Sequence, residues 1–434
     1  MAVTPFDSAL HRDLFGDAEL GRLFSDAAEV RAMLLVWGAL AKAQGAAGVI
    51  PETAGAFLHR ATMEVQVDPA GLAADVARDG ISVPGLVAAT RKALEAPEHA
   101  QFLHWGATSQ DIIDTGLALR LRQALALVAG RIDTALDRLA ALAEAHAETP
   151  MAARTWGQPA TPTTFGAVVA TWGEGLLAVR EDLEPLRTRV EIVSLHGAAG
   201  TLSAMGERGP EVRAALARAL NLRDPERAPH ADRAHVAALA AWLTRLAGAC
   251  GKAATDLLLL ARDGAVAAGA GSSSTMPQKR NPVGPSAVRA LAAHAAGLNG
   301  ALQAGAMTWD QRDGAAWFGE WLALPQLTVA AGRAVDILAA LEIVPDAERL
   351  RAALDDPSGL VHAEAVSFAL AETLPRPEAQ ARTKALAREV AEHGGSLVER
   401  AGLDPARFRP ERQWGEAPAH ARRFAARVRE GAPG

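Results

Sequence analysis

The sequence predicts an all-α protein, from two features of its composition and one of its patterning. Alanine and leucine dominate the chain, tyrosine is absent, and aromatic residues make up only 4% of it. Alanine and leucine favour helices, whereas strands prefer the aromatic residues that are scarce here. Apolar residues also recur at helical spacing in long runs, and no sustained alternation of apolar and polar residues, the strand pattern, is present.

The helical spacing is clearest between residues 131 and 148. Ile132, Leu136 and Leu139 fall on one face of the helical wheel, and the charged residues of this stretch fall elsewhere, which predicts an amphipathic helix. Short segments rich in Gly, Pro, Ser and Thr separate further runs of this kind. These runs span residues 111–129, 163–179, 235–260 and 283–302.

A chain of 434 residues is long enough for about two to four domains. Breaks in the pattern near residue 107 and at Pro345 predict an N-terminal helical domain (1–107), a central helix-bundle domain (108–345) and a C-terminal helical domain (346–434). Several central helices have broad Ala/Leu faces, more than one neighbouring helix can cover. These faces predict that copies of the chain associate through a shared helix bundle.

Composition argues against several classes of function. The net charge is -6 and no basic run is interleaved with aromatics, so a nucleic-acid partner is not expected. The apolar run 235–260 carries Arg245, Lys252 and Asp256, which favours a buried bundle helix over a membrane span. The single cysteine, Cys250, and the absence of a secretory leader pattern predict a cytoplasmic protein.

No phosphate-binding loop, dinucleotide fingerprint or CxxC motif is present. His196 and His230 are single histidines near turns, outside any cluster with metal-ligand spacing. We therefore expect neither a metal nor a cofactor.

The most specific string is GSSSTMPQKRNP, residues 271–282. Its serine-rich first half alone is typical of a mobile surface loop. The second half places Lys279 and Asn281 between Pro277 and Pro282, which fix the local backbone. An ammonium held in a rigid frame beside a serine run suits the binding of a carboxylate under a closing lid.

A second string, HWGATSQDIIDT (residues 104–115), directly precedes a long helical pattern. Thr108 or Ser109 would cap that helix, with Asp111 complementing its dipole. A helix start also binds anions, so capping and carboxylate binding are compatible. His104 is open to two interpretations, a packed core histidine or a group of the site.

A third string, RTWGQPATPTTFG (residues 154–166), contains prolines that predict a loop leading into a helix near Thr163 or Thr164. Trp156 is either a core residue or an aromatic wall for a flat substrate. A weaker signal follows at 311–313, where Arg312 lies either in an exposed turn between helices or in a carboxylate clamp.

Taken in order, the three strings resemble the conserved regions of the fumarase/aspartase superfamily. The resemblance implies a three-domain helical protomer, a homotetramer built on a central bundle, and active sites shared between subunits. It also implies that Ser273 is the general base, that Lys279 is catalytic, and that a second group of residues binds a small poly-carboxylate. This group is Thr108, Ser109, Thr155, Gln158, Asn281 and Arg312, with His104 and Trp156 beside them.

Trp156 stands where the lyase branches of this superfamily carry a histidine. A departing amine (pKa about 10) needs a proton that a histidine (pKa about 6.5) can supply, whereas a carboxylate (pKa about 4) departs unaided. The muconate cycloisomerase branch, which closes a lactone from a carboxylate, also carries RTW, and the chain resembles it here. Two alternatives stay open: an adenylosuccinate-type or other succinyl-compound lyase, and a non-catalytic helical scaffold.

Overall fold

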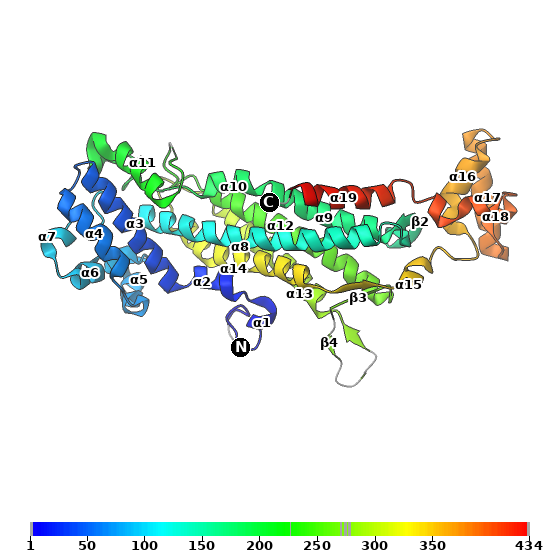
Figure 1. Cartoon of the computed structure of the whole chain (residues 1–434), viewed down its shortest axis with the longest axis horizontal. Helices are drawn as coiled ribbons and strands as arrows, with labels where there is room; N and C mark the ends of the chain where they lie inside the picture. Colours follow the sequence, from blue (N-terminus) through cyan, green and yellow to red (C-terminus); the bar gives the residue numbers. More distant parts are fainter. Residues whose placement is uncertain (1–2, 226, 270, 273–275, 277–278, 432–434) are drawn as a thin grey trace. The chain divides into compact units, whose positions relative to one another are not determined.

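The computed structural model of the chain describes residues 3–431 except 226, 270, 273–275 and 277–278. Helices account for 69% of the described residues, which confirms the all-α prediction (Figure 1). The chain divides into two compact units, the first made of residues 1–130, 181–247 and 291–333, the second of 131–180, 248–290 and 334–434. Four helices contribute several residues to each unit: α8 (Ser109–Ala145), α12 (Ala234–Arg262), α13 (Val283–Ala304) and α14 (Gly314–Ala340).

The first unit contains the N-terminal helices and a later group between residues 183 and 220. The N-terminal group is α1 (Arg12–Phe15), α2 (Ala18–Leu23), α3 (Asp26–Ala46), α4 (Glu52–Glu64), η1 (Pro69–Leu72), α5 (Ala73–Asp79), α6 (Val83–Leu94) and α7 (Pro97–Ala100). The later group is α10 (Leu183–Val190), η2 (Ser203–Arg208) and α11 (Gly209–Leu220).

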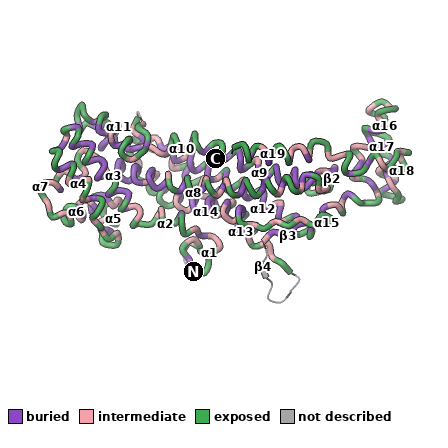
Figure 2. Tube along the Cα trace, in the orientation of Figure 1, coloured by how far each residue is buried: buried purple, intermediate pink, exposed green. Residues whose placement is uncertain are grey.

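Helices α3 and α4 pack side by side and form the centre of this unit's core (Figure 1). Ser25 caps α3 by accepting the backbone N–H of Ala28, and Asp26 in the first turn complements the helix dipole. Met33 and Trp37 of α3 are almost completely buried. Buried residues are purple on the trace in Figure 2, and α3 carries many of them. At Gly55 of α4 an added Cβ would clash with the backbone of α3, so the glycine permits this close approach.

The second unit combines helices with three short strand pairs. Its helices are α9 (Phe165–Glu181), α15 (Ala347–Arg351), η3 (Leu360–His362), α16 (Ala363–Leu370), α17 (Arg376–His393), α18 (Leu397–Arg400), η4 (Pro405–Phe408), η5 (Pro410–Arg412) and α19 (Ala417–Gly431). Its antiparallel pairs are β1 (Pro150–Thr155) with β2 (Gln158–Thr164), β3 (Val266–Ala268) with β6 (Ile343–Pro345), and β4 (Gly271–Ser272) with β5 (Arg280–Asn281).

The β1–β2 hairpin corrects the expectation of an irregular loop before α9. Its two-residue turn is Trp156-Gly157, with φ of 54° and 74°. Positive φ at both turn positions matches the twist of antiparallel strands, as in a type I′ turn. The register shifts between Ala152 and Arg154, opposite the prolines of β2, because proline lacks the N–H that a regular ladder needs.

Two helix predictions are corrected in their details. Residues 111–129 and 131–148 were expected to form separate helices, but α8 is a single helix of 37 residues. Gly130 lies inside it with no atom near the position of a Cβ, so the helix tolerates the glycine at a modest cost. The predicted boundaries of α12 and α13 agree with the structure to within two residues.

The apolar helices belong to the core. In α12, Leu243 and Cys250 are fully buried, and burial raises the pKa of the Cys250 thiol to about 12. Among the described residues only α14 is long and apolar enough to cross a membrane, and 72% of its most apolar window is buried in the protein. That degree of burial is typical of a core helix.

Candidate active site

The string 104–115 forms the turn that leads into α8 in the first unit. The helix begins at Ser109, and the carboxylate of Asp111 turns back to accept the backbone N–H of Thr108 at 2.9 Å. This three-residue spacing is that of the acidic partner in a capping box. The expected side-chain cap is absent from the described residues, because no helix amide donates to Thr108 or Ser109. The Thr108 hydroxyl is engaged by Arg312 instead.

Arg312 joins this turn although it lies far away in the sequence. Its Nη2 donates to Thr108 Oγ1 at 2.9 Å and to the carbonyl of Ala198 at 3.2 Å, and its Nε donates to Gln110 Oε1 at 3.1 Å. Nη1 donates to no described residue, and the side chain is exposed. The guanidinium is therefore held on one side and presents its remaining N–H groups outward, the arrangement of a carboxylate clamp.

Asp111 is buried beneath Thr108, with 1% of its surface exposed. Its Oδ1 accepts the backbone N–H of His196 and Nε2 of His230, each at 2.8 Å. Its Oδ2 accepts the backbone N–H of Thr108 and of Gly197, each at 2.9 Å. Every lone-pair direction of this carboxylate is thus used, and no water is needed to solvate it.

His104 is held as a neutral ring. Its Nδ1 accepts the indole N–H of Trp37 at 3.1 Å. Burial lowers the pKa of His104 to about 4, the charge of Asp111 raises it slightly, and the charge of Arg91 lowers it. Since Nδ1 is the acceptor, the ring proton is on Nε2. His104 is thereby suited to donate a hydrogen bond and is a poor base or cation.

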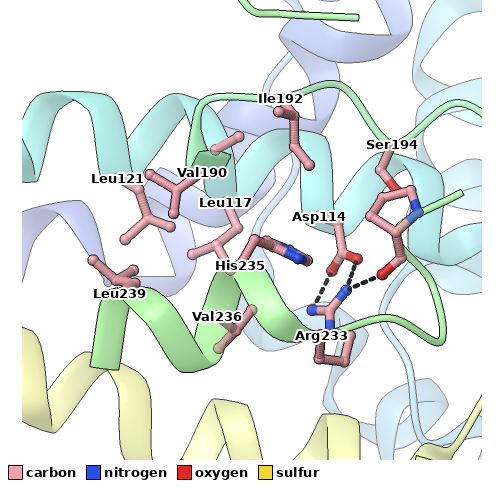
Figure 3. Close-up of a pocket in the computed structure, with 12 residues that line it drawn as sticks. Asp114, Leu117, Leu121, Val190, Ile192, Ser194, Arg233, His235, Val236 and Leu239 are labelled. Atoms are coloured by element: carbon pink, nitrogen blue, oxygen red, sulfur yellow. Dashed lines mark hydrogen bonds and ion pairs between the residues drawn. The ribbon is translucent and has the colours of Figure 1, made fainter. Parts of the chain in front are cut away.

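A buried ion network lies one turn further along α8. Arg233 donates to Asp114 at 2.6 Å (Figure 3). Through two nitrogens it also donates to Glu320, at 2.7 and 2.5 Å. The indole of Trp317 also donates to Asp114, at 3.2 Å. The carboxylates raise the pKa of the Arg233 guanidinium even though burial opposes its charge. Glu320, which is only 2% exposed, lies in α14, whereas Arg312 lies in the exposed turn before that helix.

The hairpin places its three predicted residues at an exposed turn of the second unit. Trp156 is fully exposed, and Thr155 and Gln158, which pair across the turn, are exposed as well. Neighbouring Arg154 forms an ion pair with Asp263 at 2.9 Å. The core interpretation of Trp156 is wrong for this unit, and the ring is free to contact a ligand or another chain.

The string 271–282 also belongs to the second unit. Strands β4 and β5 tie its two ends together, with Gly271 opposite Asn281. The backbone N–H of Lys279 donates to the carbonyl of Met276 at 2.9 Å, and the Lys279 side chain is exposed. Ser273, the expected general base, lies outside the described residues.

The comparison with known proteins agrees with the three strings. A family model described as "Lyase" matches residues 22–297. The chain belongs to this lyase family, within the fumarase/aspartase superfamily.

A 3-carboxy-cis,cis-muconate cycloisomerase of Pseudomonas aeruginosa is 40% identical over 395 residues, which cover 88% of the chain and 86% of the relative. A nitrosuccinate lyase of Streptomyces davaonensis is 35% identical and covers 91% of the chain and 86% of the relative. The crystal structure of the 3-carboxy-cis,cis-muconate lactonizing enzyme from Pseudomonas putida matches with a TM-score of 0.89 and 33% identity. That match covers 98% of this chain and 99% of the other.

In the lyase's first unit Arg312 thus donates to Thr108, as a shared role in substrate binding requires. Ser109 and His104 lie in the same turn as Thr108. Sequence reasoning missed the group beneath them, which comprises the turn at 196–200, His230 and the Arg233 network. The sequence carried one sign of this group: Asp111 and Asp114 stand in a largely apolar stretch, which is unusual for the solvated face of a helix. Their distant partners, 85 to 203 residues away along the chain, could not be identified from spacing alone.

Proposed function

We propose that this lyase is a cycloisomerase that converts 3-carboxy-cis,cis-muconate to 4-carboxymuconolactone, and the reverse, in the breakdown of protocatechuate. The observation that carries the proposal is the 40% identity to a curated 3-carboxy-cis,cis-muconate cycloisomerase over nearly the whole chain. Because the match spans nearly the whole chain, it supports a shared reaction as well as a shared fold.

In the proposed reaction one substrate carboxylate adds to the far double bond. A carbon–oxygen bond forms, the electron pair of the double bond moves to the neighbouring carbon, and the adjacent carboxylate takes up the charge as an enediolate. That carbon then receives a proton, and Ser273 is the group proposed to exchange it. Since a carboxylate becomes an ester, one proton is consumed for each lactone formed near neutral pH.

The described residues fit the binding of several carboxylates. Arg312 offers its free Nη1 to one carboxylate, and the first-turn amides of α8 beside Thr108 and Ser109 favour negative charge. Lys279 and Asn281 hold the carboxylate next to the carbon that receives the proton. A fixed cation there stabilises the second negative charge of the enediolate, which is present only near the transition state.

The position of Trp156 favours lactone formation over the elimination of an amine. The attacking or departing group is a carboxylate, with a reference pKa of about 4, so neither direction needs a histidine at this position. Thr155 and Gln158 flank the ring at the hairpin turn and are proposed to contact the substrate with it.

We further propose a cytoplasmic homotetramer whose active sites combine residues of different subunits. The full exposure of Trp156 supports this, because a large apolar ring at a hairpin turn is costly to leave in water. Light scattering coupled to size-exclusion chromatography tests the assembly. A monomer that turns over substrate at the full rate would exclude shared sites.

The decisive assay follows the loss of the ultraviolet absorbance of the conjugated diene on adding purified protein to 3-carboxy-cis,cis-muconate. Adenylosuccinate and nitrosuccinate serve as alternative substrates, since the superfamily and the Streptomyces relative offer these activities. Lys279→Ala should reduce turnover by orders of magnitude in a folded protein, whereas a scaffold would be indifferent. Turnover of a succinyl compound with none of the muconate would refute the proposal.

A further inference from the structure

We infer that Asp111 is a positioning residue, which sets the aim of Arg312 without touching it or the substrate. The inference rests on the proposed function in one respect, that the corner formed by Thr108, Ala198 and Arg312 binds a substrate carboxylate. We call these three residues the Arg312 corner and residues 196–200 the supporting turn.

Asp111 ties together the two backbone segments that hold Arg312. One carboxylate oxygen accepts the N–H of Thr108, whose hydroxyl is one acceptor of Arg312 Nη2. The same oxygen accepts the N–H of Gly197, and the next carbonyl, of Ala198, is the other acceptor of Nη2. Both acceptors of a single guanidinium nitrogen are therefore placed by one buried carboxylate.

The supporting turn needs this anchor because its own bonds are few. Gly197 and Gly200 have φ of 73° and 79°, a conformation that glycine adopts without cost and that defines no side-chain packing. Within the turn the N–H of Gly200 donates to the carbonyl of Gly197 at 3.5 Å, which is long for a hydrogen bond. The carbonyl of His196 accepts the backbone N–H of Leu202 at 2.7 Å, and the N–H groups of His196 and Gly197 both donate to Asp111, so the carboxylate anchors the N–H side of the turn.

His230 completes the arrangement from the opposite side. Its Nε2 donates to Asp111 at 2.8 Å, and its backbone carbonyl accepts Nε2 of Gln110 at 3.2 Å. Gln110 in turn accepts Nε of Arg312 at 3.1 Å. Hence Asp111 and His230 together determine all three acceptors that orient the guanidinium.

A carboxylate is the only common side chain that satisfies all four donors at once. In Asp111→Asn the amide nitrogen would face N–H groups of the backbone or of His230, which leaves donors without acceptors in a buried place. The supporting turn would then shift, and Ala198 and Thr108 would no longer hold the guanidinium in one orientation. The expected consequence is weaker carboxylate binding with the catalytic groups of the second unit untouched.

The test compares Asp111→Asn with Asp114→Asn in the full-length protein. Asp114 lies one turn later on α8, is also buried, and binds Arg233 and Trp317 but no part of the Arg312 corner. For each variant we would measure Tm, kcat and KM for the muconate, and the Kd of propane-1,2,3-tricarboxylate, an unreactive probe with three carboxylates. This probe reports binding even if the muconate is not the substrate, which separates failure of this inference from failure of the proposed function.

Asp111→Asn should raise KM and the probe's Kd about 10- to 100-fold, a range expected for a lost charge-assisted clamp, with a smaller change in kcat. Asp114→Asn should lower Tm at least as much as Asp111→Asn does, but it should change the probe's Kd less than threefold. Adding Arg312→Lys to Asp111→Asn should weaken binding much less than it does in the wild type, because the two changes disable one device.

If Asp111→Asn fails to fold, variants of His230 test the same arrangement from the other side of the Asp111 carboxylate. His230→Gln retains an N–H donor for Asp111 and should keep Kd near the wild-type value, whereas His230→Ala should raise it. Equal effects of Asp111→Asn and Asp114→Asn on Kd and KM, or additive effects of Asp111→Asn and Arg312→Lys, would overturn the inference and leave Asp111 a purely structural residue.

Discussion

Replacing Arg312 with lysine probes the carboxylate clamp at its most exposed point. In the wild type three of the five N–H bonds of the guanidinium are directed by Thr108, Ala198 and Gln110, and the bonds on Nη1 remain for substrate. A lysine ammonium has the same charge but only three donors and no planar fork. It cannot keep the supporting contacts and bind the carboxylate in the same geometry.

The loss is set by the hydrogen bonds that disappear. A hydrogen bond between charged groups contributes about 1.5–3 kcal/mol, and about 1.4 kcal/mol corresponds to a factor of ten. One such bond lost in Arg312→Lys therefore predicts a fall in kcat/KM of about 10- to 100-fold, mostly through KM. Because Arg312 is exposed, the Tm should hardly change.

Steady-state kinetics on the muconate measure this effect, and Arg122→Lys is the matched control. Arg122 is also in the first unit and donates to two backbone carbonyls, those of Leu220 and Asn221, at 2.7 and 2.8 Å. It forms no hydrogen bond with a described residue of the three motifs, so its variant should keep kcat/KM within about twofold. If Arg312→Lys also stayed within twofold, the clamp assigned to this arginine would not exist.

Three further changes test other parts of the site. Arg233→Met should lower the free energy of unfolding by about 3–5 kcal/mol in chemical denaturation, because two buried carboxylates lose their cation; a loss below 1 kcal/mol would contradict this. Burial lowers the pKa of both His104 and His196 to about 4, whereas a histidine of the unfolded chain has a pKa of about 6.5. Below pH 6.5 the unfolded chain therefore binds more protons than the folded one. Stability should thus be level above neutral pH and fall as the pH drops from about 6.5 towards 4, by about 1 kcal/mol per histidine at pH 5.5, and His104→Gln should make the fall shallower; an unchanged slope would show that the ring is not held neutral. Trp156→His should not create an amine-eliminating activity by itself but should slow lactone formation, which product analysis by chromatography detects; a rate at or above that of the wild type would remove the tryptophan from the site.

The sequence predicts helices well where burial repeats along a single helix. The limits of α12 and α13 were expected almost to the residue, since continuous apolar faces end at Gly, Pro and charged residues. The β1–β2 hairpin was missed because its strands carry prolines and its pairing depends on two positive φ values at Trp156 and Gly157. Non-glycine residues adopt such values rarely, so no propensity would have indicated a tryptophan there.

The sequence predicts those site residues whose chemistry is visible in a short string. Thr108, Ser109 and Lys279 are predicted to bind substrate or act in catalysis, because each stands in such a string. The bonds from Asp111 to His230 and to the supporting turn join segments 85 to 119 residues apart, and only the folded chain brings them together. The two predicted domain boundaries and the roles of the site residues stay predictions for experiment.

Proton nuclear magnetic resonance of the reaction of 3-carboxy-cis,cis-muconate with the enzyme in D2O tests the proposed proton transfer to carbon. We expect a single lactone product that carries one deuterium, on the carbon next to the carboxylate held by Lys279. We also expect one proton equivalent to be consumed for each molecule of diene lost in a parallel titration in H2O. A product without deuterium at that carbon, or unchanged diene alongside fumarate formed from a succinyl compound, would contradict it.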